Sequence, residues 1–139
     1  MRHIYNAANM LGRIFLIALY VWSGISKISN FGFFEHYAAS RGVPAFLLVA
    51  SIVVELGGSL LLLAGYQVRI VALVLAGYSI IALLLFYGIH PSGLEAQIIA
   101  YAELADAGGF LVLVGSGGGG WTLDAVLGRR KSAAALPKA

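Results

Sequence analysis

Long apolar stretches separated by short polar breaks dominate the pattern of this chain. Four of them have the length of a transmembrane helix, which needs about 20 mainly apolar residues. Their ranges are 10–28, 44–64, 70–89 and 94–114. The third stretch carries no charge and the second carries only Glu55, whereas the fourth contains Glu95, Glu103 and Asp106. The pattern therefore predicts an all-α protein with four membrane spans.

The links between the stretches predict how the spans are arranged. Residues 65–68 and 90–93 are links so short that the spans they join must be antiparallel neighbours in a four-helix transmembrane bundle. Gly65 suits a helix end in the left-handed conformation. The link 29–43 is rich in aromatic residues, which favour the bilayer interface, so we expect a short interfacial helix there.

Composition supports this architecture. The chain has 139 residues, of which 60 % are hydrophobic and 11 % charged, against about 45–50 % and about 25 % in soluble domains. This excludes a soluble globular domain, and it excludes disorder. Residues 1–116 are predicted to form one membrane domain, and 117–139 a Gly-rich and then basic tail. The chain has no cysteine, which excludes disulfides and thiolate-bound metals.

The positive charges lie mostly on one side of the predicted bundle. The other side has only Lys27 and Arg41. The positive side of a membrane protein is normally cytoplasmic, so we expect both termini in the cytoplasm and no nucleic-acid partner for the net charge of +3. The residues on the positive side are Arg2, Arg13, Arg69, Arg129, Arg130, Lys131 and Lys138.

The second and fourth stretches share a motif. It reads E-x-G-G-x-L at 55–60 and D-x-G-G-x-L at 106–111. The first and third stretches share Arg-Ile at 13–14 and 69–70, followed by an aromatic residue and a serine at 22–23 and 78–79. We therefore predict two repeated helical hairpins in the same orientation, related by an axis along the membrane normal. The glycine pairs also suit close helix packing in lipid.

Charged groups within the spans form a candidate intramembrane polar site. Such groups are costly in lipid and face the interior of a bundle. The site comprises Arg13, Lys27, Glu55, Glu103 and Asp106. Tyr20 lies on the same helix face as Arg13 and Lys27, because these three residues recur every seven positions. We expect Arg13 to form a buried pair with Glu55, which leaves Asp106 as a candidate proton-binding group.

The opposite end of the bundle has its own polar residues. Glu35, His36, Tyr37 and His90 form a candidate outer-face pocket. Histidines on two separate links are more often interfacial residues than ligands, so we predict no metal site. The three histidines do not form a mid-membrane pair for haem, and the chain has no P-loop, H-E-x-x-H or G-x-S-x-G motif. Whether the protein is an enzyme stays open.

Several short motifs, taken in order, point to a family. They are Gly12-Arg13, Ser23-Gly24-x-x-Lys27, Phe31, Gly42-Val43-Pro44, Glu55-x-Gly57-Gly58 with Gly65 and Arg69, Gly108-Gly109 and Trp121-Thr122-Leu123-Asp124. In their order and spacing the chain resembles the DoxX family of membrane proteins. It departs from the family pattern where Ala102-Glu103 replace a Lys-Asn pair and Asp106 is added.

The resemblance implies a multi-pass protein of the bacterial inner membrane with a link to redox chemistry. Its relatives include a subunit of an archaeal thiosulfate:quinone oxidoreductase and a membrane partner of oxidant-defence enzymes. Three hypotheses follow: a redox-linked accessory or quinone-associated subunit without its own redox centre, a chaperone-like assembly protein, and a proton-coupled small-molecule carrier. Besides the bilayer, the candidate partners are a redox protein and a second copy of the chain.

The predicted topology is testable because the chain has no native cysteine. In intact cells, Pro91→Cys should react with a membrane-impermeant maleimide. Ser132→Cys should react only after permeabilisation, since the basic tail is expected in the cytoplasm. The reverse labelling pattern would overturn the assignment.

Overall fold

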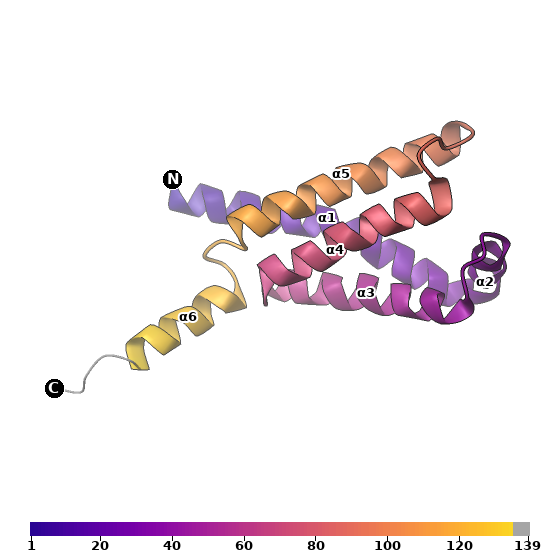
Figure 1. Cartoon of the computed structure of the whole chain (residues 1–139). Helices are drawn as coiled ribbons and strands as arrows, with labels where there is room; N and C mark the ends of the chain where they lie inside the picture. The colour runs from indigo at the N-terminus through magenta and orange to yellow at the C-terminus, as the bar shows by residue number, and fades with distance from the viewer. Residues whose placement is uncertain (135–139) are drawn as a thin grey trace.

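The protein is all-α, as predicted. The computed structural model describes residues 1–134, and this part of the chain contains helices and no strand (Figure 1). The helices are α1 (Arg2–Ser29), α2 (Phe31–Ser40), α3 (Ala45–Ala64), α4 (Val68–Ala82), the π-helical η1 (Leu83–Tyr87), α5 (Leu94–Ser116) and α6 (Leu123–Ala134).

Four helices are long and apolar enough to cross a membrane, which confirms the four predicted spans. They are Arg2–Ser29, Ala45–Ala64, Val68–Tyr87 and Leu94–Ser116. The first helix begins eight positions before the predicted span, because its hydrogen-bonded backbone continues past the apolar stretch. Large apolar side chains such as Phe15, Leu73 and Val112 are exposed on the outside of the bundle, where they contact lipid.

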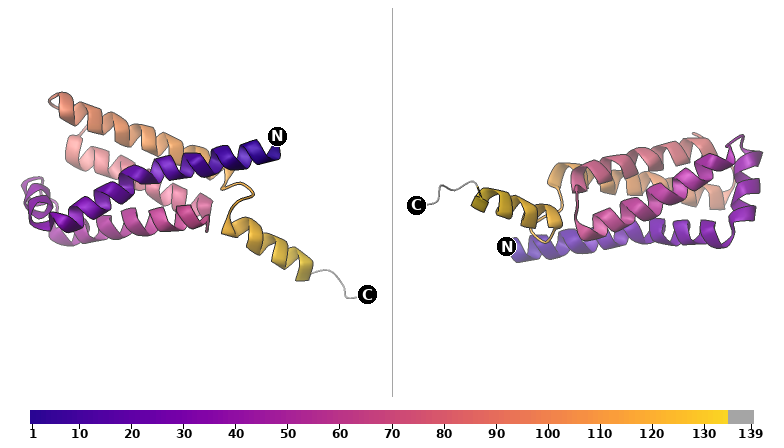
Figure 2. Two further views of the ribbon diagram at one scale, coloured as in Figure 1. Left: turned by 180° about the vertical axis from the view of Figure 1, so that it is seen from behind. Right: turned by 90° about the horizontal axis from the view of Figure 1, so that it is seen from below.

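The long helices run side by side as antiparallel neighbours (Figures 1 and 2). The closest packing joins α1 to α3 and α4 to α5, with α3 against α4. The start of α1 and helix α6 lie at one end of the bundle, called here the terminal end (Figures 1 and 2). The predicted short helix between spans 1 and 2 is present as α2, and it runs across the opposite end, called here the α2 end (Figure 2).

The terminal end is closed by the segment 117–122, called here the strap. The guanidinium of buried Arg13 donates to the carbonyl oxygens of Leu62, at 2.8 Å, and Trp121, at 3.1 Å. The carboxylate of Asp124 then accepts hydrogen bonds from the backbone N–H groups of Gln67 and Val68, at 2.8 and 3.0 Å, at the start of α4. Neither this docking nor helix α6 was predicted for the tail.

One glycine of each predicted pair lies at a helix crossing. A Cβ on Gly58 would lie 2.9 Å from Cδ2 of Leu75 in α4, and one on Gly109 would lie 2.5 Å from Cδ2 of Leu16 in α1. Gly57 and Gly108 have no such neighbour within 4 Å. Close packing therefore explains Gly58 and Gly109. The repeat of the two hairpins stays a prediction.

Gly65 joins the strap to the core, and its replacement should be costly. It ends α3 with a φ of 71°, and an added Cβ would lie 2.8 Å from the backbone Cα of Thr122. We expect Gly65→Ala to destabilise the protein by about 1–3 kcal/mol, the usual cost of a left-handed non-glycine residue. Unfolding in mixed micelles measures this.

The matched control is Gly77→Ala. Gly77 lies within α4, and a Cβ added there would have no neighbour within 4 Å. This replacement should be neutral or slightly stabilising, since alanine favours a helix more than glycine does. Equal stability of the two variants would contradict the tight approach of the strap to Gly65.

Candidate functional site

A cavity of about 440 Å³ lies in the half of the bundle next to α2. Its walls come from α1, α2, α3, α4, η1 and α5, and most of the lining is apolar. The volume falls in the range typical of small-molecule sites. The lining residues are Leu19, Tyr20, Ser23, Lys27, Phe34, Tyr37, Ala38, Val43, Leu47, Leu48, Ala50, Ser51, Val54, Glu55, Tyr78, Ile81, Ala82, Leu85, Phe86, Tyr87, Ile99 and Glu103.

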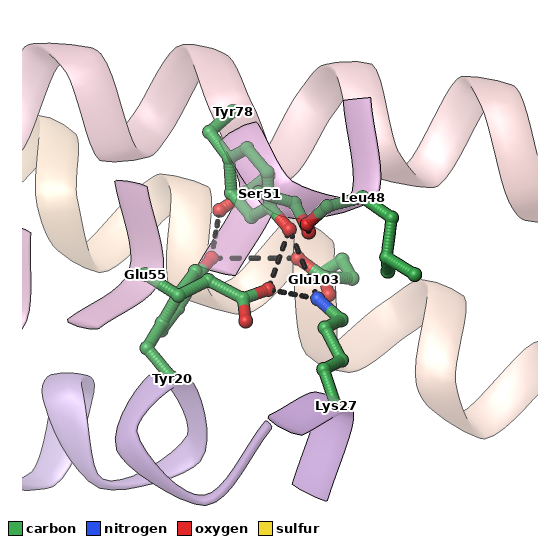
Figure 3. Close-up of polar contacts among 8 residues, drawn as sticks. Tyr20, Lys27, Leu48, Ser51, Glu55, Tyr78 and Glu103 are labelled. Atoms are coloured by element: carbon green, nitrogen blue, oxygen red, sulfur yellow. Dashed lines mark hydrogen bonds and ion pairs between the residues drawn. The ribbon is translucent and has the colours of Figure 1, made fainter. Parts of the chain in front are cut away.

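Lys27, Glu55 and Tyr78 form a polar cluster within this cavity (Figure 3). Lys27 Nζ and the Tyr78 hydroxyl both lie 2.5 Å from the same oxygen, Glu55 Oε1. Lys27 Nζ is also 3.3 Å from the Tyr78 hydroxyl. The side chains of Lys27 and Glu55 are 14 % and 4 % exposed, so most of the ion pair is removed from solvent.

The expected Arg13–Glu55 pair is wrong, because Glu55 pairs with Lys27. Helical side chains tilt toward the N-terminus of their own helix. Glu55 therefore leans toward the α2 end and Lys27 leans inward to meet it, while Arg13 leans toward the terminal end and binds carbonyl groups there. The depth of Glu55 in the membrane suggested Arg13 as its partner, but the direction in which the side chains tilt makes Lys27 the partner.

Tyr20 connects the polar cluster to a second carboxyl group. Its hydroxyl hydrogen-bonds to the Ser79 hydroxyl and donates to Glu103 Oε2 at 3.4 Å. Its ring packs edge-on against that of Tyr78, with the centroids 6.0 Å apart. Glu103 reaches the cavity from α5, so carboxyl groups of α3 and α5 both line it (Figure 3).

The other predicted site residues lie elsewhere. Asp106 does not line the cavity, and its Oδ2 atom is buried without a hydrogen-bond partner. Of the candidate outer-face pocket only Tyr37 lines the cavity, because Glu35, His36 and His90 are exposed. Within residues 1–134, no group of three His, Asp or Glu side chains is placed to hold a metal ion.

Aromatic residues close the α2 end of the cavity. The rings of Tyr37 and Phe86 stack with centroids 5.7 Å apart and an interplanar angle of 11°. The Arg41 guanidinium lies 5.4 Å from the Tyr37 ring centroid and donates to the Phe86 carbonyl group. Phe86 belongs to η1, and π-helical turns are frequent at functional sites.

One wall of the cavity reaches the lipid-facing surface. Leu47, Ile81 and Leu85, called here the rim, line the cavity and are also 41, 58 and 49 % exposed. At the rim the cavity therefore borders the lipid-facing surface of the bundle.

Sequence reasoning did not assign Tyr20, Ser51 and Tyr78 to the site. Tyr20 was marked by its seven-residue spacing from Lys27. Tyr78 was noted only as the aromatic residue of the aromatic–serine pair that the first and third stretches share. No sequence signal distinguishes Ser51, whose hydroxyl donates to the Leu48 carbonyl within its own helix.

Comparison with known proteins places these residues in a family context. The DoxX family model matches residues 8–88, a range that includes the polar cluster but not Glu103. The inner membrane protein YqjF of Escherichia coli (strain K12) is 29 % identical over 130 residues, which cover 94 % of this chain and 99 % of that relative. No solved structure matches the chain at a significant level.

A double-mutant cycle tests the ion pair. Removing one partner of a buried pair costs roughly 3–5 kcal/mol, because the other charge stays buried and unpaired. We expect Glu55→Gln to destabilise the protein, and Lys27→Met with Glu55→Gln to recover part of that loss. The measurement is the free energy of unfolding in mixed micelles.

The matched comparison is the cycle of Arg13→Gln with Glu55→Gln. These effects should add, since the two residues share no partner. Coupling of Glu55 to Arg13 rather than to Lys27 would contradict the observed pairing.

Proposed function

Because this chain belongs to the DoxX family and is a multi-pass inner-membrane protein, we propose that it is a redox-linked accessory subunit that binds a quinone-class molecule. It would hold the molecule without a redox centre of its own and present it to a partner enzyme. The observation that carries the proposal is an apolar cavity that combines a polar cluster, an aromatic end and a rim open to lipid.

The cavity matches the three parts of such a ligand. A quinone has a flat ring with polar oxygens and an apolar tail. The oxygens would lie at Lys27, Glu55 and Tyr78, the ring among the aromatic side chains near Tyr37, and the tail would leave past the rim into the bilayer. Aromatic side chains favour stacked or edge-on contact with flat rings.

The depth of the polar groups also supports the proposal. Glu55 lies ten residues into α3 from the α2 end and Glu103 nine residues into α5. At 1.5 Å per residue, both are roughly 15 Å from that end. A head group at this depth would be shielded from water. Its oxygens would therefore form hydrogen bonds to protein groups rather than to water.

The rival hypotheses have less support from the geometry. A carrier needs access from both sides, but the cavity ends before the terminal end, where Leu62, Leu75 and Phe110 are packed without exposure. Asp106, the candidate proton-binding group, lies outside the cavity. An assembly protein needs a docking surface on its outside rather than an internal cavity. The cavity therefore does not favour the assembly hypothesis.

Ligand binding to protein in lipid nanodiscs tests the proposal. A short-tailed ubiquinone analogue should bind the unmodified protein, as measured by equilibrium dialysis. Ala82→Phe should weaken binding at least tenfold, because Ala82 lines the cavity and the larger ring would fill it.

Ala18→Phe is the matched control, since Ala18 is exposed on α1 and does not line the cavity. It should leave the affinity unchanged. If the unmodified protein binds no quinone, and its deletion leaves quinone reduction and oxidant sensitivity unchanged, the redox proposal fails and the assembly hypothesis leads.

A further inference from the structure

We propose that helix α2 is a lid over the cavity, held shut by Arg41, and that its opening gives molecules in the aqueous phase access to the polar cluster. This inference rests on the proposed function, in which a partner enzyme has to reach the bound head group, and adds how the site is opened. Three observations carry it: the place of α2, the contacts that hold it, and the chain conformation at its two ends.

Helix α2 forms the wall of the cavity at the end of the bundle. It runs across the α2 end instead of along the other helices (Figure 2), and Phe34, Tyr37 and Ala38 line the cavity from it. Other residues of α2, such as Glu35 and His36, are exposed. Because the long helices span the membrane, this end lies at a membrane surface. Helix α2 therefore stands between the cavity and the aqueous phase.

One hydrogen bond holds α2 to the helix across the cavity. Within residues 1–134, the hydrogen bond from the Arg41 guanidinium to the Phe86 carbonyl group is the one that joins residues 31–43 to another helix. We call this bond the latch. The guanidinium also lies 5.4 Å from the ring centroid of Tyr37, which stacks on Phe86. Arg41 is exposed, so its donors can exchange the carbonyl group for water.

The latch uses a carbonyl group at the end of a helix. The last carbonyl groups of a helix have no partner within it, and Phe86 lies one residue before the end of η1 at Tyr87. Gly88 follows with a φ of 66°, outside the helical conformation. A cation is also favoured at the C-terminal end of a helix. Both the free carbonyl group and the charge therefore explain why Arg41 binds there.

The chain leaves the helical conformation at both ends of α2. Asn30, the residue between α1 and α2, has a φ of −124° and a ψ of 40°. At the other end, Gly42 has a φ of 73° and no neighbour within 4 Å of an added Cβ. Lids commonly hinge at a few residues at the ends of elements. Helix α2 can thus move as one unit once the latch is broken.

The closed and open arrangements would serve different steps. With the latch made, α2 excludes water from the head group, which strengthens the polar contacts around it. With the latch broken, Ser23 and Lys27, which line the cavity from α1, would become accessible from the aqueous phase. The latch would therefore set how often a molecule outside the membrane reaches the site.

Cysteine labelling tests the lid, because the chain has no native cysteine. Ser23→Cys places a thiol in the cavity, and a charged, membrane-impermeant methanethiosulfonate reaches it from water and not through lipid. In nanodiscs without ligand, adding Arg41→Gln should speed this labelling roughly fivefold, because the loss of one hydrogen bond shifts the balance of open and closed forms by about that factor. Mass spectrometry of the modified fraction against time gives the rate.

The matched control is Arg69→Gln, which makes the same replacement at an exposed position near the start of α4, at the terminal end. It should leave the labelling rate at position 23 unchanged. Arg41→Lys should keep part of the protection, because an ammonium group can still donate to the carbonyl group. Ala39→Cys, on the exposed side of α2, should be labelled equally fast with and without Arg41→Gln.

An unchanged rate at position 23 in Arg41→Gln overturns the lid. Arg41 is exposed, so the variant is expected to fold, and its thermal unfolding verifies this. Equal acceleration by Arg69→Gln, or acceleration at Ala39→Cys, indicates a general loosening of the protein and overturns the lid as well. The labelling needs no ligand, so a rate that depends on the latch in a protein that binds no quinone analogue supports the lid while the proposed function fails.

Discussion

The buried pair of Lys27 and Glu55 is the constraint on which the cavity half of the bundle depends. Charges in a membrane interior usually pair with one another, so this pair holds the end of α1 at a fixed depth against the middle of α3. Tyr78 adds α4 to the same contact through Glu55 Oε1. Three of the four spans thus meet at one carboxylate oxygen, and the space beside it becomes the cavity.

The two cations of α1 that face the interior, Arg13 and Lys27, make different contacts. Arg13 binds one carbonyl oxygen of α3 and one of the strap. A guanidinium group has five N–H donors in a fixed plane, so it can donate to both carbonyl groups at once. Lys27 meets a carboxylate and keeps a donor. The terminal end is therefore packed and closed, whereas the α2 end holds polar groups around open space. This division leaves the cavity and its polar cluster in one half of the bundle.

The α2 end combines fixed and adaptable parts. Helix α2 is linked to η1 by the Tyr37–Phe86 stack and by Arg41, which fixes the aromatic end of the cavity. The rim residues are aliphatic and face lipid, so the lateral wall has no polar bond to break when a ligand enters. Under the proposed function, an apolar molecule would reach the polar cluster from the bilayer without crossing water.

The sequence by itself determined the all-α class, the four spans, helix α2 and the left-handed turn at Gly65, because apolar length and turn chemistry are local properties of the chain. The glycine motifs also indicated two of the close helix crossings. Only the tertiary structure decided the partner of Glu55, since that depends on the direction in which each helix tilts its side chains. It also decided that Tyr37 lines the cavity while His36 is exposed, and that Asp124 draws the tail onto α4. These contacts join residues far apart in the chain, and no local pattern encodes them.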